Sequence, residues 1–276
     1  MTQATIDPDA FRQFEADGWG KVADAYHRFF GQITSRVIES LLDAARVRSG
    51  MRVLDLATGP GYAAARAAAR GASVVGVDIA SEMVSLHPGV EFRQADAEQP
   101  PFADRSFDAL VGNFAILHFG RPEAAVAEFT RLLVPGGYLA LSMWDGPERA
   151  RILGVVFDAV QEAGAILPAD VPPGPPVFRF SSDEEFSGLL RSAGLEGIEV
   201  RAVAFTHRLS SPDQLWNAVL SGSVRTAATI VGQTEETQRR IRSAFDRLMR
   251  EYSVADGLEV PVSVKIASGQ KPRLAA

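Results

Sequence analysis

Two carboxylates and two glycines are the residues of this 276-residue chain whose types and spacing best suit chemistry on a small molecule. Asp55 stands in one short apolar run, Gly59 and Gly61 follow that run at once, and Asp78 ends a second, β-branched run. Carboxylates accept hydrogen bonds from hydroxyl and amino groups and attract cations. Glycine lets the backbone turn sharply and lets a ligand approach it closely. The pattern therefore indicates a ligand site built around a tight turn.

The elements that must position these residues form one strand, helix and strand unit. Residues 51–56 read as a strand buried on both faces, and residues 73–77 read as a second strand. The alanine-rich stretch 62–70 favours helix strongly, and Gly71 suits its end. In open α/β sheets ligands bind at the carboxyl ends of the strands, which is where both carboxylates fall.

The identity of the ligand follows from the charges around the turn. The glycine pair, followed by Ala64 and by an acid at Asp78, also satisfies the dinucleotide fingerprint. A pyrophosphate there would be repelled by Asp55, and Pro60 removes one N–H donor that a phosphate would use. S-adenosylmethionine removes the conflict because it carries a sulfonium and an ammonium group. A plain packed turn and an NAD site stay open as alternatives.

The stretch 53–61, V-L-D-L-A-T-G-P-G, resembles motif I of class I S-adenosylmethionine-dependent methyltransferases. It is most similar to the small-molecule branch that includes ubiquinone and menaquinone methyltransferases and natural-product tailoring enzymes. Ala57 stands where the family more often has glycine. The resemblance implies a Rossmann-like, doubly wound α/β fold with a seven-stranded sheet, parallel except for strand seven.

The resemblance also implies the residues that hold the cofactor. The stretch 95–108 is similar to the family's D-A-x-x-x-P-F-x-D-x-S-F-D run, in which the first acid accepts a hydrogen bond from adenine. A W-x6-Y pattern in the N-terminal segment is often seen in the lid of family members. The predicted cofactor-binding residues are Trp19, Tyr26, Asp55, Ala57, Gly59, Gly61, Asp78, Ile79, Met83, Asp96, Ala97, Glu98, Asn113 and Phe114.

His118 follows the predicted fourth strand, residues 108–113, and is the candidate catalytic residue. An ordinary histidine titrates near pH ~6.5 and can act as a general base on a hydroxyl or phenol. The alternative for this residue is a structural or substrate-contact role.

The chain outside this core suggests a lid and a cap. Residues 1–45 are rich in aromatic side chains and read as helices over the cofactor, or simply as a cover for the sheet edge. Two helices, 212–231 and 235–252, separate strands six and seven, so we divide the chain into a lid (1–45), a core (46–210 and 258–276) and a cap (211–257). The predicted substrate-side residues are Phe14, Trp144, Phe178, Trp216 and Arg225, although Trp216 fits a cap core equally well.

Composition narrows the function classes. The formal net charge is −6, which argues against a nucleic-acid partner held through phosphates. There is no cysteine, hence no disulfide and no thiolate metal site, and we expect no metal. No apolar run reaches membrane-spanning length and residues 1–10 show no signal pattern, so we expect a cytoplasmic protein with no membrane partner. A homo-oligomer stays open.

The sequence therefore predicts methyl transfer from S-adenosylmethionine to a small, largely apolar acceptor, by C- or O-methylation. The setting in secondary metabolism is implied by the family resemblance alone. One alternative is a cyclase or binding protein on the same fold that binds S-adenosylmethionine without transfer. The other is an NAD-dependent oxidoreductase.

Overall fold

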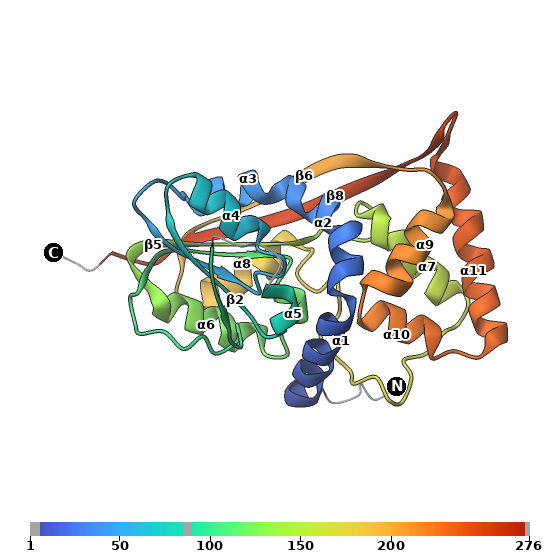
Figure 1. The fold of residues 1–276 in the computed structure, drawn as a ribbon, viewed down its shortest axis with the longest axis horizontal. Coiled ribbons are helices and arrows are strands. Elements are labelled where there is room, and N and C mark those ends of the chain that lie inside the picture. The colour runs from blue at the N-terminus through green and yellow to red at the C-terminus, as the bar shows by residue number, and fades with distance from the viewer. Residues whose placement is uncertain (1–5, 85–89, 274–276) are drawn as a thin grey trace.

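The computed structural model describes residues 6–84 and 90–273. Its sheet runs in the order β3-β2-β1-β4-β5-β8-β6, and β7 pairs with β8 (Figure 1). Strands β1 to β5 pair in parallel, whereas β8 is antiparallel to both β5 and β6. The strands are β1 Arg52–Leu56, β2 Ser73–Asp78, β3 Glu91–Gln94, β4 Phe107–Asn113, β5 Leu133–Trp144, β6 Glu196–Leu209, β7 Ser253–Val254 and β8 Gly257–Gln270. The predicted doubly wound sheet with an antiparallel last strand is confirmed.

Helices cover both faces of this sheet, with α3 and α4 on one side and α6 and α8 on the other (Figure 1). The helices are α1 Pro8–Arg28, α2 Phe30–Thr34, α3 Ile38–Ala44, α4 Tyr62–Ala69, α5 Ser81–Val84, α6 Pro122–Leu132, α7 Arg151–Glu162, α8 Asp183–Ser192, α9 Pro212–Gly222, α10 Arg225–Val231 and α11 Glu235–Met249. Short 3₁₀ turns occupy η1 Ser35–Val37, η2 Ile116–His118 and η3 Arg250–Tyr252.

The turn between β1 and α4 is held together by the strand that precedes it. Gly61 adopts a left-handed conformation with φ +80°, which a residue with a side chain rarely takes, and α4 starts directly after it. The first N–H groups of a helix lack intrahelical partners, and Asp55 accepts one of them from Ala64. The alanines of α4 facing the sheet are fully buried, so the helix lies close to β1.

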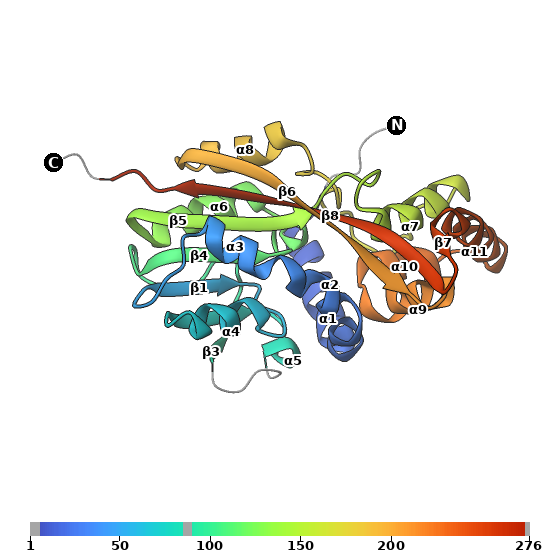
Figure 2. The same cartoon turned by 90° about the horizontal axis from the view of Figure 1, so that it is seen from above.

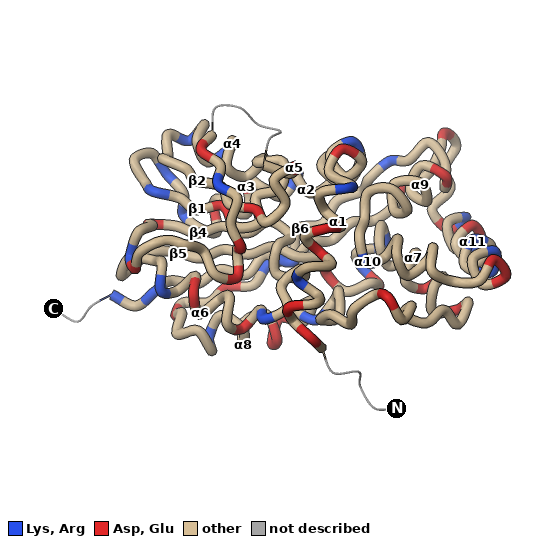
Figure 3. Tube along the Cα trace, turned by 60° about the horizontal axis from the view of Figure 1, so that its bottom comes forward, with Lys and Arg blue, Asp and Glu red and all other residues tan. Residues whose placement is uncertain are grey.

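Strands β6 and β8 continue past the sheet as a long hairpin, paired from Glu196 and Gln270 to Leu209 and Leu258. The hairpin carries α9, α10 and α11 beyond the strand ends (Figure 2), and both acidic and basic residues lie along α11 (Figure 3). Helix α7, which lies within the segment predicted as core, packs against α11. The carboxyl ends of β1, β2 and β4 thus face the lid helix α1 and this helical cap.

The cap differs from the prediction in one respect, because the predicted helix 212–231 is two helices. Ser223 between them has an extended backbone, with φ −125° and ψ 153°. Its hydroxyl donates to the carbonyl of Val219 and accepts from the N–H of Ala227, so it ends α9 and caps α10. The break places Val224, which precedes α10, against Gly18 of α1.

Candidate active site

A cavity lies where the carboxyl ends of β1, β2 and β4 meet α1 and the α9–α10 turn. Most of the predicted site residues line it, although they come from seven separate stretches of sequence. They are Trp19, Tyr26, Ala57, Gly59, Asp78, Ile79, Met83, Asp96, Ala97, Glu98, Asn113, Phe114, His118, Trp144 and Arg225.

Asp78 closes β2 at the wall of this cavity and fixes the glycine turn opposite. Its Oδ2 accepts from the N–H of Gly59 at 2.8 Å, and its Oδ1 accepts from the N–H of Ala80 at 3.0 Å. Burial raises the pKa of Asp78 above its usual range, while these backbone hydrogen bonds oppose the shift. Each carboxylate oxygen keeps a second lone pair with which to accept a hydroxyl of a ligand.

Asp55 and Gly61 do not line the cavity, although both were predicted to bind the cofactor. Asp55 is 1% exposed, and its Oδ2 accepts from Thr58 Oγ1 at 2.6 Å and from the N–H of Ala64 at 2.9 Å. Its Oδ1 is buried with no hydrogen-bond partner among the described residues. Desolvation raises the pKa of Asp55 to about 7. Both residues therefore shape the turn from behind, because the strand points this carboxylate inward.

Backbone strain is concentrated at the cavity wall. Ala57 has φ +47° and Phe114 has φ +57°, a region that residues with a side chain rarely adopt, and both line the cavity. This explains in physical terms why glycine suits position 57. Non-glycine residues in such conformations cluster at ligand sites, where the surrounding structure holds them.

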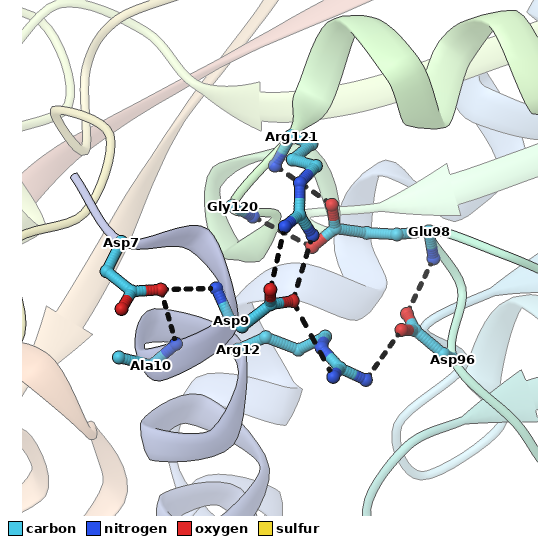
Figure 4. Close-up of polar contacts among 8 residues, drawn as sticks. All are labelled: Asp7, Asp9, Ala10, Arg12, Asp96, Glu98, Gly120 and Arg121. Carbon is cyan, nitrogen blue, oxygen red and sulfur yellow. Dashed lines mark hydrogen bonds and ion pairs between the residues drawn. The ribbon is translucent and has the colours of Figure 1, made fainter.

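The lid helix α1 is tied to the core by two ion pairs (Figure 4). Arg12 Nη1 donates to Asp96 Oδ2 at 3.0 Å, so a lid residue pairs with the carboxylate predicted to contact adenine. Arg121 binds Asp9 through two hydrogen bonds of 3.0 and 2.9 Å. These contacts close one side of the cavity.

Glu98 organises the floor beneath those pairs. Its carboxylate accepts from the backbone N–H groups of Gly120 at 2.8 Å and Arg121 at 2.9 Å. Its own N–H donates to Asp96 Oδ1 at 2.8 Å, which orients that side chain (Figure 4). Burial raises the pKa of Glu98 above its usual range. Glu98 thus connects the loop after β3 to the start of α6.

Glu15 is the functional candidate that the sequence analysis missed. It is 4% exposed, and its Oε2 lies 2.8 Å from Trp19 Nε1 and 2.8 Å from His118 Nδ1. The ring of Trp19 also meets the His118 ring edge-on, with centroids 5.0 Å apart. The signal available in the sequence was a glutamate four residues before Trp19, on the same face of the lid helix. All three side chains line the cavity.

Tyr26 contributes a neutral hydroxyl to the same wall. Its hydroxyl lies 3.1 Å from Thr34 Oγ1, and burial raises the pKa of Tyr26 to about 12. Its ring meets Trp19 edge-on at 5.4 Å. Tyr26 therefore offers a hydrogen bond and an apolar face, and it does not serve as a base near neutral pH.

Three of the five predicted substrate-side residues lie elsewhere. Trp216 packs inside the cap, with its ring centroid 5.2 Å from that of Phe245. This is the cap-core position given above as the alternative for Trp216. Phe178 packs on Phe157 at 5.1 Å, and Phe14 is half-buried on α1 outside the cavity lining. The sequence identifies these side chains as apolar, but it does not show whether they line the cavity or pack elsewhere in the hydrophobic core.

Two structural absences bear on the expectations above. Within residues 6–84 and 90–273, no three His, Asp or Glu side chains gather as a metal site would require. Over the same ranges, no helix combines the length and the apolar character needed to cross a bilayer.

Comparisons with known proteins agree on one family. Residues 54–141 match the family model described as a methyltransferase domain. The demethylmenaquinone methyltransferase of Renibacterium salmoninarum is 35% identical over 41% of this chain and 50% of its own length. The malonyl-[acyl-carrier protein] O-methyltransferase of Erwinia billingiae is 30% identical over 57% of this chain and 69% of its own. The first of these matches thus spans only about half of that relative.

A solved structure shows the same fold over nearly the whole chain. The [4+2]-cyclase SpnF superposes with a TM-score of 0.58, covering 98% of this chain and 100% of its own, at 17% identity.

Proposed function

This chain belongs to the class I S-adenosylmethionine-dependent methyltransferases, and on that premise we propose that it methylates a small, largely apolar acceptor at an oxygen atom. S-adenosylmethionine is the cofactor of the family, so the NAD-dependent alternative is overturned. The observation that carries the proposal is the pair of the buried Glu15 and the half-buried His118, which faces the same cavity as Asp78.

The residues present fit the cofactor. Asp78 stands at the end of β2 with lone pairs free for a ribose diol, and Ile79 and Met83 offer apolar contacts to adenine. The Oδ1 of Asp55, which has no hydrogen-bond partner among the described residues, places oxygen lone pairs and not N–H donors behind the turn, which suits a positively charged ligand better than a pyrophosphate. When bound, S-adenosylmethionine supplies an electrophilic methyl group.

The chain's own contribution is to position the acceptor and remove its proton. Because Nδ1 of His118 is bound to Glu15, its Nε2 is the atom available to take a proton from an acceptor hydroxyl. The Glu15 carboxylate fixes the ring and stabilises the imidazolium that results. Apolar side chains such as Leu117 and Trp144 line the cavity and exclude water. A carbon acceptor would not need this pair, so the geometry favours oxygen.

Secondary metabolism is the setting we propose for this reaction. Quinone methyltransferases among the relatives act on acceptors that fit a small apolar cavity. The remaining alternative is a protein that binds the cofactor without transfer, since this fold also carries a cyclase.

The experiment is a transfer assay with methyl-deuterated S-adenosylmethionine and a panel of phenols and hydroxylated apolar compounds. Labelled product and S-adenosylhomocysteine in equal amounts, and their loss in His118→Asn, support the proposal. Tight cofactor binding with no S-adenosylhomocysteine from any acceptor would favour the alternative without transfer.

A further inference from the structure

Arg225 is a cation in the cavity that has no ion-pair partner among the residues the structure describes. It begins α10 on the cap side, is half-buried, and lines the cavity beside Val224. Its Nη1 donates to the carbonyl of Pro175 at 2.7 Å, and its guanidinium lies 5.2 Å from the centre of the Phe11 ring. A guanidinium has five N–H donors, and among the described residues this is the one hydrogen bond that the Arg225 guanidinium donates.

Among the described residues, a second arginine that is withdrawn from solvent has an anionic partner, in contrast to Arg225. Arg151 in α7 is also withdrawn from solvent, with its side chain 14% exposed, yet it binds Asp158 at 2.8 Å and the hydroxyl of Tyr252. Across the described ranges, Arg225 forms no ion pair of that kind. Burial lowers the pKa of Arg225, and the negative charge of Glu15 opposes this shift. Because this charge is half-buried and has no ion pair among the described residues, an anion that enters the cavity would gain a charge-assisted hydrogen bond with it.

The surroundings of Arg225 indicate which anion fits. The cavity wall near it is apolar, with Leu153, Val177 and Val224. The same cavity already holds the acidic side chains of Glu15 and Asp78, which would repel a doubly charged phosphate more strongly than a single charge. A planar carboxylate matches the fork of one guanidinium and carries one charge.

We propose that the methyl acceptor is an apolar molecule bearing a carboxylate, and that Arg225 binds this carboxylate as the anchor of the acceptor. This inference rests on the proposed function. The carboxylate is the anchor and not the atom methylated, because pairing with a guanidinium stabilises its charge and lowers its nucleophilicity. The methylated hydroxyl then lies at the other end of the molecule, toward His118.

The test uses matched acids and amides. 3-(4-Hydroxyphenyl)propanoate, 5-phenylpentanoate and their primary amides are titrated calorimetrically into the wild-type chain, saturated with S-adenosylhomocysteine. The variants are Arg225→Gln, Arg225→Lys and Arg240→Gln, the last removing an exposed cap arginine as a charge-matched control. In the wild type and in the Arg240→Gln control, we expect the affinity of each acid to exceed that of its amide by about tenfold or more. Arg225→Gln should abolish the preference, and Arg225→Lys should reduce it.

Several outcomes would overturn the inference. They are equal affinities for acid and amide, no binding of any acid, or a preference that survives in Arg225→Gln. A tenfold loss of S-adenosylhomocysteine affinity in Arg225→Gln would place the arginine on the cofactor instead. In a parallel transfer assay with S-adenosylmethionine, a methyl ester as the product of 3-(4-hydroxyphenyl)propanoate would make the carboxylate the acceptor and also contradict it. Failure of the wild type to bind S-adenosylhomocysteine would refute the proposed function itself. That result is distinguishable from failure of the carboxylate inference alone, in which S-adenosylhomocysteine still binds.

Discussion

The Nδ1 atom of His118 lies 2.8 Å from Oε2 of Glu15, although 103 positions separate the two residues in sequence. The lid helix thus supplies one member of the pair and the turn after β4 supplies the other. The pair can form only when α1 is docked on the core, so docking of the lid and assembly of the proposed base are the same event.

Removal of either member of this pair should lower turnover while leaving cofactor affinity nearly unchanged. General bases contribute roughly 10²–10⁴-fold in rate, and we expect losses in that range for His118→Asn and Glu15→Gln. Because the two residues act as a unit, the double variant should be little slower than the worse single variant. Turnover at saturating substrates and S-adenosylhomocysteine affinity would be measured side by side. Full turnover in His118→Asn would reject the base.

The contact between lid and cap depends on the absence of a side chain at Gly18 in α1. A Cβ atom there would lie 2.3 Å from Cγ1 and 3.1 Å from Cβ of Val224, a branched residue that cannot move aside freely. Gly18→Ala should therefore destabilise the protein by about 1–3 kcal/mol, despite the better helix propensity of alanine. Gly188→Ala in α8 is the control, since its Cβ would meet nothing within 4 Å, and it should stabilise by roughly 0.5–1 kcal/mol. Urea unfolding compares them, and equal effects would contradict the packing.

The ion pairs of α1 should control how fast the cofactor leaves. The side chains of Arg12 and Asp96 are 38% and 23% exposed, so this pair stabilises folding by no more than about 1 kcal/mol. Its loss should nonetheless speed opening of the lid. We expect Arg12→Gln with Arg121→Gln to raise the dissociation rate of S-adenosylhomocysteine several-fold, measured by stopped-flow displacement. Arg66→Gln, which removes an exposed pair away from the cavity, should leave the rate unchanged. An unaltered rate in the double variant would show that the pairs do not hold the lid.

The buried Asp55 should make folding stability depend on pH. Its pKa is raised to about 7 in the folded chain, whereas an unfolded aspartate titrates near pH ~4. Between those values the native state holds more protons than the unfolded state, so the free energy of unfolding falls as pH rises. Asp55→Asn keeps an acceptor for Thr58 and Ala64 without the charge, so it should flatten this decline. Part of the decline will remain, because the pKa of Asp78 and that of Glu98 are raised as well. The urea midpoints of the wild type and of Asp55→Asn would be measured at pH 5, 6, 7 and 8. If the midpoints of both proteins changed equally with pH, burial of Asp55 would not be the cause of the decline.

The sheet and the position of the cavity could be predicted because both rest on local patterns. The strand–turn–helix stretch ending on Asp78 has a short-range signature, and the rule that ligands bind at strand ends places the site without knowledge of packing. What sequence reasoning could not supply was the direction of individual side chains. Asp55 and Asp78 look equivalent in sequence, yet one supports the turn from behind and the other faces the cavity.

Long-range partners were the other limit. Glu15 carries no motif, and only the docking of α1 on the turn after β4 reveals its contact with His118. In the cap, Trp216 on α9 packs against Phe245 in the interior, whereas Arg225 on α10 lines the cavity. The break at Ser223 separates these two helices. The Ser223 hydroxyl stabilises that break by bonding the backbone of Val219 and Ala227, and helix propensity alone does not reveal it.

Calorimetric titration of the wild type and of Asp78→Asn with S-adenosylhomocysteine, with S-adenosylmethionine and with NAD tests the central claim most directly. The account predicts binding of the first two ligands and none of NAD, with affinity weakened by ~1.5–3 kcal/mol in Asp78→Asn and unchanged in Asp24→Asn, an exposed control on α1. Binding of NAD alone, or equal affinity of Asp78→Asn and the wild type for S-adenosylhomocysteine, would contradict it.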